Sequence, residues 1–330
     1  MAVNNGPRVM VIGSINIDLV AGVDRLPREG ETVWALGFEQ HLGGKGANQA
    51  AVAGLMGAQA VMVGCVGDDV FGPRALQGLQ QVGVDCSLVR TVAGTSTGAA
   101  LITVGRRGEN TIVVIPGANG AVTPADVERA AGAMAACDAV MVQFEVPEAV
   151  VLAVAQTIAR LREAAARPLL VLNPSPFRAS ALPPAGTVDL LIVNELEAEE
   201  MTGHKVANPA DAAEAARKLL PWLRPGGRVV VTLGEQGAVA LSDGDMPAPL
   251  YIPARKVQAV DTTGAGDTFA GALVVQLCAG RSMAEALRFA TTAAAITVTR
   301  PGAQSSFPRR EEVEAALDGA PEPVPLLRKG

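Results

Sequence analysis

The segment that decides the fold class opens with Ala139-Val-Met-Val-Gln-Phe144 and closes with Leu169-Leu-Val-Leu172. Both ends are short apolar runs of the kind that forms a buried strand. Between them, residues 148–165 are rich in helix-forming residues such as Ala, Leu and Glu. A strand, a helix and a second strand in this order predict a βαβ unit, whose strands lie parallel in a sheet covered by helices on its faces.

The same alternation runs along most of the chain. The other strand runs are Val9–Ile12, Val61–Val66, Leu190–Val193 and Val229–Leu233. The other helix candidates are residues 47–57, 73–83, 124–136, 209–222, 267–279 and 283–298. We therefore expect an α/β fold with a doubly wound, mostly parallel sheet flanked by helices, built by residues 1–330 as a single domain.

Two regions interrupt the alternation. Residues 16–42 show no helical pattern and contain many polar and turn residues. Further on, Thr97–Val104 and Thr111–Ile115 flank the turn Gly105-Arg-Arg-Gly108, which predicts a β-hairpin. We expect these inserted strands, at about 16–42 and 97–116, to form a small separate sheet that can cover a site as a lid.

Composition narrows the function classes. The chain has 27 Lys and Arg against 33 Asp and Glu, a net charge of −6, and only 3% aromatic residues. It offers neither a basic stripe for a phosphate backbone nor platforms for base stacking, so we expect no nucleic-acid partner. We find neither a long uncharged apolar run nor a secretory signal pattern, so we expect a cytoplasmic protein without a membrane partner. The two histidines are too isolated for a metal cluster or a Ser-His-Asp triad.

The most informative motif is Asp261-Thr-Thr-Gly-Ala-Gly-Asp-Thr-Phe269, directly before a helix candidate. Gly264 and Gly266 allow a tight turn that exposes backbone N–H groups where the positive end of the helix points. Such N–H groups can bind a phosphoryl group during its transfer. Asp267 then has two interpretations: a general base for an attacking hydroxyl, or a favourable acidic residue in the first helical turn.

Four further motifs follow predicted strands or open helices. They are Asn16-x-Asp18, Gly43-Gly-Lys-Gly-Ala-Asn48, Asn194-x-x-Glu197 and Thr232-x-Gly234-x-x-Gly237. Taken alone, each has a plain structural interpretation, such as turn chemistry for Asp18, helix entry for Asn48 or a solvated surface lysine for Lys45. Asn194 and Glu197 fit an N-terminal capping box equally well. A phosphate-binding P-loop and a dinucleotide fingerprint both fail, because the required Gly and Ser/Thr positions are not filled.

Together and in this order, the five motifs resemble those of the ribokinase-like (PfkB) carbohydrate kinases, over the chain from about Val9 to Pro308. The resemblance implies an ATP-dependent enzyme that converts D-ribose to D-ribose 5-phosphate, with Asp267 as general base. The catalytic set that it implies is Asp267, Gly264, Ala265 and Gly266. The sugar-binding set is Asn16, Asp18, Gly44, Lys45, Asn48, Glu145 and Asp267.

The resemblance also implies a nucleotide site and two kinds of cation. The nucleotide set is Asn194, Thr232, Gly234, Gly237, Gly266 and Thr291, of which Thr291 stands where the family often has a larger polar residue. Mg²⁺ would be held through water by Asn194 and Glu197. K⁺ would lie beside the anion-binding turn, with several carbonyl ligands, at Asp261, Thr263, Thr297, Arg300, Gly302 and Ser306.

Two alternatives to a ribose kinase remain open at this point. One is another kinase of the same family, for deoxyribose, fructose, 2-keto-3-deoxygluconate or a nucleoside. The other is a sugar sensor that has kept the fold without the activity. Apolar residues in the first insertion, such as Val33, Trp34 and Leu36, need cover, so we expect a homodimer that forms through the lid strands, as in the family.

Overall fold

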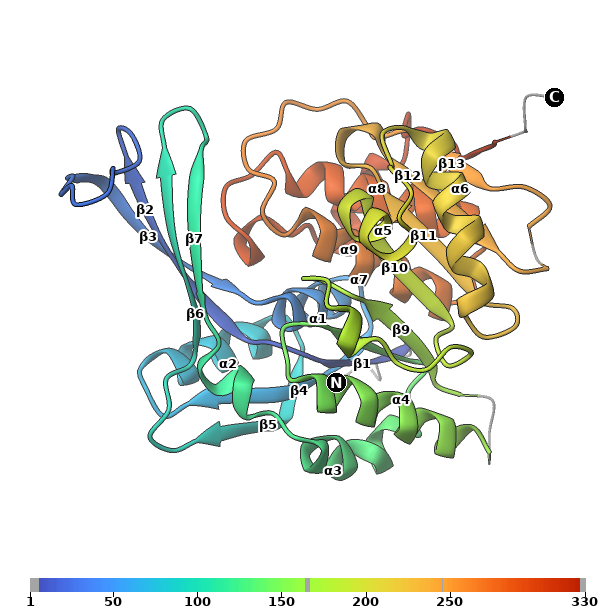
Figure 1. Ribbon diagram of the computed structural model, residues 1–330, viewed down its shortest axis with the longest axis horizontal. Coiled ribbons are helices and arrows are strands. Elements are labelled where there is room, and N and C mark those ends of the chain that lie inside the picture. Colours follow the sequence, from blue (N-terminus) through green and yellow to red (C-terminus); the bar gives the residue numbers. More distant parts are fainter. Residues whose placement is uncertain (1–5, 164–166, 245, 327–330) are drawn as a thin grey trace.

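The computed structural model describes residues 6–163, 167–244 and 246–326. Within these ranges, the main sheet has ten strands in the order β14-β13-β12-β11-β10-β9-β8-β1-β4-β5 (Figure 1). The seven strands from β11 to β5 are parallel, and β12, β13 and β14 continue the sheet in antiparallel pairing. The strands are β1 Arg8–Ile12, β4 Gln59–Gly67, β5 Asp85–Val92, β8 Ala139–Gln143, β9 Leu169–Asn173, β10 Leu190–Asn194, β11 Arg228–Thr232, β12 Ala238–Ser242, β13 Leu250–Ile252 and β14 Val324–Pro325.

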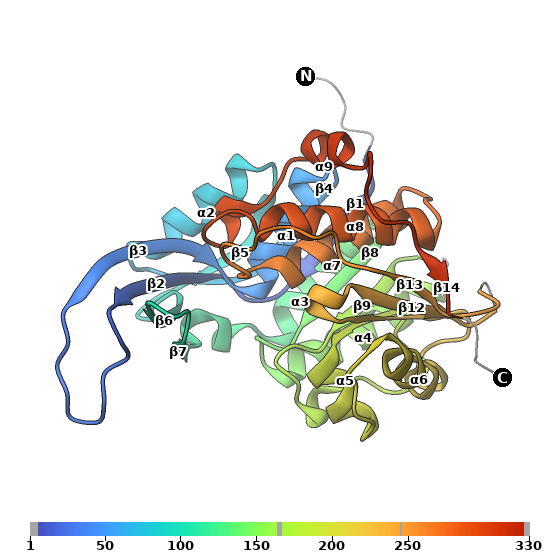
Figure 2. The same ribbon diagram turned by 90° about the horizontal axis from the view of Figure 1, so that it is seen from above.

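Helices cover both faces of this sheet, as Figure 2 shows from above. The split follows the alternation of side chains along each strand: Val9 and Val11 of β1 join one apolar cluster, while Met10 and Ile12 join the other. The first cluster is covered by α1 Lys45–Leu55, α2 Phe71–Gln81, α7 Ala265–Cys278, α8 Met283–Thr297 and α9 Arg310–Ala316. The second is covered by α3 Pro124–Met134, α4 Glu148–Arg162, α5 Glu195–Thr202 and α6 Pro209–Leu219.

The expected fold class is therefore confirmed: a mostly parallel sheet flanked by helices. All six predicted strand runs and all seven predicted helices appear, with ends that differ by a few residues. Helix α6 ends at Leu219, earlier than the predicted limit at 222, and a 3-10 turn over Leu220–Trp222 follows. Pro221 explains the difference, because proline lacks the N–H that an α-helix needs at that position.

The small inserted sheet is also confirmed. Its strands are β2 Asn16–Val23, β3 Ala35–Gly43, β6 Gly98–Gly105 and β7 Asn110–Ile115, in the order β3-β2-β6-β7. Figure 1 shows these strands as a separate layer that extends beside the main sheet. Strand β2 starts a few residues after β1 ends, so the small sheet stands at the carboxyl edge of the main sheet.

The strand order places a crevice at that same edge. From β1 the chain passes to β4 on one side and later returns to β8 on the other side. The connections that follow β1 and β8 leave the sheet in opposite directions. A crevice therefore forms between the carboxyl ends of these two strands, where ligands bind in sheets of this kind. None of the helices in the described ranges has the length and apolar character of a membrane-spanning segment.

Candidate active site

The turn before α7 has a conformation that requires glycine. Gly264 is the N-cap of α7 and has a φ of 76°, in the left-handed region. A Cβ atom at this position would lie 2.7 Å from the ring of Phe307, so both the backbone angle and the space favour glycine. The first N–H groups of α7 have no carbonyl four residues earlier within the helix, and that of Ala265 donates to the Thr262 carbonyl at 3.2 Å. The sequence predicts an anion-binding turn at this position.

Asp267 lies in the first turn of α7 and is 93% buried, with 7% of its surface exposed. Its Oδ2 accepts a hydrogen bond of 2.9 Å from Asn48 Nδ2, and its Oδ1 accepts one of 3.0 Å from Gln49 Nε2. Burial raises the pKa of Asp267, while the Lys45 ammonium and the two amide donors oppose that rise. Both contacting groups are neutral amides, so the carboxylate keeps its capacity to accept a proton.

Glu145 lies at the other end of the crevice, after β8. Its Oε2 accepts hydrogen bonds from Ser14 Oγ and from the Lys45 backbone N–H, the latter at 3.0 Å. The carboxylate therefore sits at the N-terminal end of α1, where the helix dipole favours a negative charge. The start of α1 and Ser14, in the segment after β1, thus fix the position of Glu145, which the family resemblance assigns to sugar binding.

Asn16 and Asp18 come from β2 and face the same region. Asn16 is buried, and its Oδ1 accepts a hydrogen bond of 2.7 Å from Asn119 Nδ2. With its oxygen engaged, Asn16 presents N–H groups to a ligand. Burial, followed by the neighbouring Glu145 carboxylate, raises the pKa of Asp18 to about 6. The Asp267 carboxylate raises that pKa as well.

Gly44 and Lys45 bring the backbone of α1 close to these residues. Gly44 has a φ of 89°, and a Cβ atom there would lie 2.8 Å from the Asn16 backbone nitrogen. Lys45 is half-buried, which contradicts its interpretation as a solvated surface lysine. Burial acts to lower the pKa of Lys45, but the carboxylates of Asp267, Glu145 and Glu197 outweigh it and raise that pKa. Lys45 therefore stays a cation among these carboxylates.

The expected nucleotide residues lie at the carboxyl ends of β10 and β11. Asn194 and Thr232 are neighbours across the two strands. Asn194 Oδ1 accepts the Glu197 N–H at 2.9 Å, and Glu197 Oε2 accepts the Asn194 N–H at 3.0 Å, so the capping box is present. Gly234 and Gly237 have φ values of 50° and 100°. Thr291 lies apart on α8, buried, and its Oγ1 has no hydrogen-bond partner in the described ranges.

The loop residues expected to bind K⁺ are joined through Asp261. Its Oδ1 accepts the Thr263 N–H at 2.9 Å, and its Oδ2 accepts the Gly302 N–H at 2.9 Å. These hydrogen bonds outweigh burial and lower the pKa of Asp261, so it stays charged. The Arg300 side chain pairs with Glu312, which leaves only its backbone for an ion. Thr297 and Ser306 are fully buried and supply hydroxyl oxygens of the kind that hard cations prefer.

No cluster of three His, Cys, Asp or Glu side chains in the searched part of the chain is arranged to hold a metal ion. Carbonyl, hydroxyl and single carboxylate oxygens are instead the available ligands in the Asp261 loop. This donor set suits a weakly held monovalent cation.

A model of a known protein family, described as pfkB family carbohydrate kinase, matches residues 7–310. The chain belongs to this family. It is an ATP-dependent carbohydrate kinase. The match spans all five motifs and every described strand except β14.

Relatives of this kinase cover nearly its whole length. It is 38% identical to the ribokinase of Mus musculus over 312 residues, which are 94% of each chain. It is 34% identical to the deoxyribokinase of Salmonella typhi, over 94% of this chain and 98% of the other. Among solved structures, it is similar to the ribokinase of Arabidopsis thaliana complexed with ribose and ATP, with a TM-score of 0.84 and 31% identity over 94% of this chain and 99% of that one.

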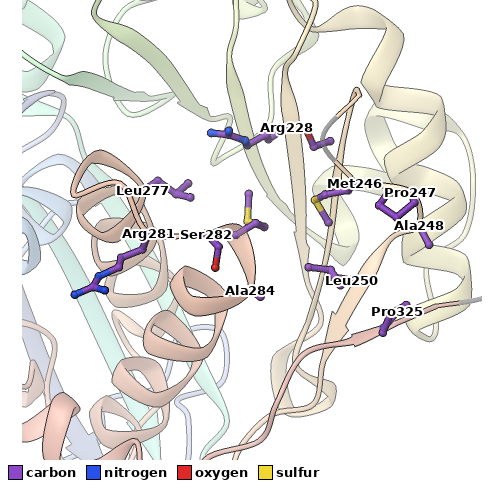
Figure 3. A pocket seen from close by; sticks show the side chains of 12 residues that line it. Arg228, Met246, Pro247, Ala248, Leu250, Leu277, Arg281, Ser282, Ala284 and Pro325 are labelled. Carbon is purple, nitrogen blue, oxygen red and sulfur yellow. The ribbon is translucent and has the colours of Figure 1, made fainter.

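A cavity of about 410 Å³ lies elsewhere in this kinase, between α7 and α8 on one side and β11 to β13 on the other (Figure 3). Leu277 and Ala284 face it from the helices, and Met246 and Leu250 face it from the strand side. It is lined by Arg228 at the start of β11, whereas the nucleotide residue Thr232 ends that strand. The cavity therefore lies at the opposite end of the strands from Asp267 and is not the catalytic crevice.

Several polar residues of the crevice were missed by the sequence analysis. They are Ser14, Gln49, Asn119, Gln143, Asn173 and Gln304. Gln49 directly follows the glycine motif, so its place in the chain was a usable signal. The others carry no local signal, because their partners lie on elements that are distant in the sequence.

Proposed function

We propose that the protein transfers the γ-phosphoryl group of ATP to the primary hydroxyl of D-ribose and forms D-ribose 5-phosphate. The observation that carries this proposal is the buried Asp267 carboxylate, held by Asn48 and Gln49 at the anion-binding turn of α7. The ribose assignment is supported by similarity to ribokinases, one of which is described as complexed with ribose and ATP.

The chemistry follows from the geometry of the first turn of α7. Asp267 takes the proton of the attacking hydroxyl, and the sugar oxygen attacks the γ-phosphorus in line with the leaving ADP. The N–H groups from Gly264 to Asp267 stabilise the negative charge that develops on the phosphoryl oxygens. Lys45, between the two sides of the crevice, adds a positive charge near the transferred group.

The sugar is held by amide and carboxylate groups on both sides of the crevice. A pentose carries several hydroxyls that both donate and accept, and the set offers acceptors at Asp18 and Glu145 and donors at Asn16. Gly44 lets the start of α1 pack closely against the backbone of Ser14 to Asn16, which brings the proposed contacts of α1 and β2 together. The sugar contacts in this proposal are Asn16, Asp18, Gly44, Lys45, Asn48 and Glu145.

The nucleotide and the cations occupy the carboxyl ends of β10, β11 and the turns near α7. Asn194, Thr232, Gly234, Gly237, Gly266 and Thr291 contact ATP in this proposal. Glu197 and Asn194 hold Mg²⁺ through its water, and the Asp261 loop binds K⁺ through Asp261, Thr263, Thr297, Arg300, Gly302 and Ser306. When bound, the two ions neutralise phosphate charge and fix the turn beside Asp267.

We also propose that residues 1–330 form one domain and that the small sheet closes over the sugar. Closure would exclude water, so that ATP is not hydrolysed in place of transfer. The exposed apolar side chains of this sheet, among them Trp34, Leu36 and Phe38, would then be covered in a homodimer formed through the lid strands.

A substrate panel tests the assignment. ADP release is measured with ATP alone and then with D-ribose, 2-deoxy-D-ribose, D-fructose, 2-keto-3-deoxygluconate and adenosine, in potassium and in sodium buffers. The highest kcat/KM is expected for D-ribose. A higher value for 2-deoxy-D-ribose would move the assignment to the activity named in the Salmonella relative. No sugar-dependent ADP release at all would favour a sensor without catalysis.

A further inference from the structure

The side-chain amide of Gln49 lies at the centre of a buried hydrogen-bond network. Its Nε2 donates to Asp267 Oδ1 and to Asn173 Oδ1, each at 3.0 Å. Its Oε1 accepts a hydrogen bond of 2.5 Å from Gln143 Nε2. Gln49 and Gln143 are both fully buried, so every polar group of the Gln49 amide is engaged by the protein rather than by water.

The orientation of this amide is set from the backbone of the sheet. Asn173 Nδ2 donates to the Ile192 carbonyl at 2.9 Å, and a backbone carbonyl can only accept. Asn173 must therefore turn its oxygen toward Gln49, so Gln49 must present its NH₂ group. The reverse orientation of Gln49 would place its oxygen against the oxygens of both Asn173 and Asp267. In this arrangement the Gln143 N–H meets the Gln49 oxygen, while Gln143 Oε1 is buried without a hydrogen-bond partner in the described ranges.

A donor fixed in this way acts on the protonation state of Asp267. Burial disfavours the carboxylate, whereas hydrogen bonds donated to it favour the charged form. Asn48 is the other donor, but its Oδ1 also accepts from Gln304 at 3.2 Å, and it belongs to the proposed sugar contacts. Gln49 is the donor whose remaining partners all belong to the protein.

We propose that Gln49 is a positioning residue for phosphoryl transfer. Its amide keeps Asp267 ionised and holds Oδ1 in place, so that Oδ2 can serve the substrate. Gln143 and Asn173 act through Gln49. This inference rests on the proposed role of Asp267 as general base, and it predicts a change in the pH profile, which a merely structural role would not produce.

Other charged groups also face Asp267 and must be kept constant. Lys45 on α1 lowers the pKa of Asp267, and Glu145 after β8 raises it. Asp18 on β2 interacts with Asp267 and titrates near pH 6. All three charged groups remain in a Gln49 variant. A difference between its pH profile and that of the wild type therefore reports the loss of the Gln49 amide. The kcat value at saturating sugar is the quantity to follow, because it reports groups in the complex rather than in the free enzyme.

We expect two substitutions at Gln49 to shift the pH profile of kcat in the same direction by different amounts. Gln49→Leu removes the donor, and we expect the acidic limb of the kcat profile to move upward by about one pH unit, with the plateau within about threefold of wild type. Gln49→Glu places a second carboxyl group against Asp267, and we expect a larger upward shift. If Gln49→Leu does not fold, Gln143→Leu carries the test, with a smaller shift in the same direction.

The control is Gln276→Leu, which removes another buried glutamine from α7, about two and a half turns from Asp267. Its profile should match the wild type. Carboxyl ¹³C shifts of Asp267, assigned with Asp267→Asn, should show the same rise in pKa without any turnover. An unshifted profile in folded Gln49→Leu, or an equal shift in Gln276→Leu, overturns the inference. Full activity of Asp267→Asn would instead overturn the proposed base itself.

Discussion

At the scale of single residues, Asp18 and Asp267 show how two carboxyl groups in one crevice are held in different ways. Both are partly or fully buried, which disfavours the charged form and raises their pKa values. At Asp267 the Lys45 ammonium and two amide donors oppose this effect, whereas at Asp18 the opposing influence is His41, its partner across β2 and β3. Asp18 is therefore the group whose charge changes at mildly acidic pH.

The first prediction concerns Asp267. Replacement by Asn keeps the shape and the position at the start of α7 but removes the base, so we expect kcat to fall by about 10²–10⁴-fold. Nucleotide affinity, measured by calorimetry with ADP, should change little because the N–H groups of the turn remain. Turnover close to wild type in a correctly folded variant would contradict the role of base.

The second prediction concerns Asp18 and pH. Its pKa in the folded protein is raised to about 6, so it is a carboxylate above that pH and protonated below it. Protonation removes an acceptor for the sugar hydroxyls, so the KM for D-ribose should rise as the pH falls through 6. The folded state disfavours the charged form of Asp18. The contribution of Asp18 to the free energy of unfolding therefore falls as pH rises from about 4 toward 6. Asp18→Asn should weaken sugar binding at all pH values and abolish this pH dependence of KM.

At the scale of elements, the entry to α7 joins conformation to catalysis. Gly264 is left-handed and packs against Phe307, and only then can the helix start with its N–H groups toward the crevice. Gly266, in the same turn, has open space where its Cβ would lie. The two glycines of one motif therefore differ. Gly264 is needed for its positive φ and its packing against Phe307, whereas Gly266 lies beside open space, which the proposed mechanism gives to the phosphoryl group.

The third prediction compares these two positions. Gly264→Ala should lower the free energy of unfolding by about 1–3 kcal/mol, because alanine at a positive φ is strained and its methyl group meets the Phe307 ring. Gly266→Ala should leave stability unchanged or slightly increase it, since alanine favours a helix. Urea unfolding of both variants gives the comparison, and equal losses at the two positions would contradict it.

Sequence patterns predicted the elements with a regular apolar pattern and missed several that lack one. Strand β5 was missed because Asp85, Ser87 and Arg90 interrupt its apolar pattern at the sheet edge. Helix α5 is short, and its capping box was considered only as an alternative to magnesium binding. The motif residues were found because glycines and carboxylates mark special chemistry. Gln49, Gln143 and Asn173 were not, because a buried glutamine or asparagine shows its partners only after α1, β8 and β9 have packed together.

At the scale of the whole molecule, the small sheet exposes large apolar side chains to solvent. Trp34 is 92% exposed, and Phe38 of β3 is 60% exposed. On the other edge strand, Ile112 and Val113 are more than half exposed as well. Apolar side chains of this size on both edge strands of a small sheet are typical of a surface that pairs with another chain.

The fourth prediction is that this surface joins two copies of the chain. The Trp34→Glu, Phe38→Glu double variant should sediment as a monomer under conditions where the wild type is a dimer, because charges in a buried interface are costly. Val70→Glu is the matched control, since Val70 is 80% exposed and lies in the main body before α2. Analytical ultracentrifugation decides, and a monomeric wild type would remove the basis for a dimer.

The contact between Asn48 and Asp267 joins residues 219 positions apart. On the proposed mechanism, a chain that is still being synthesised has no base until α7 has left the ribosome and packed on α1. The turn proposed to hold the phosphoryl group arrives with the same helix. A copy that stops before α7 would therefore lack both groups and could not transfer phosphate.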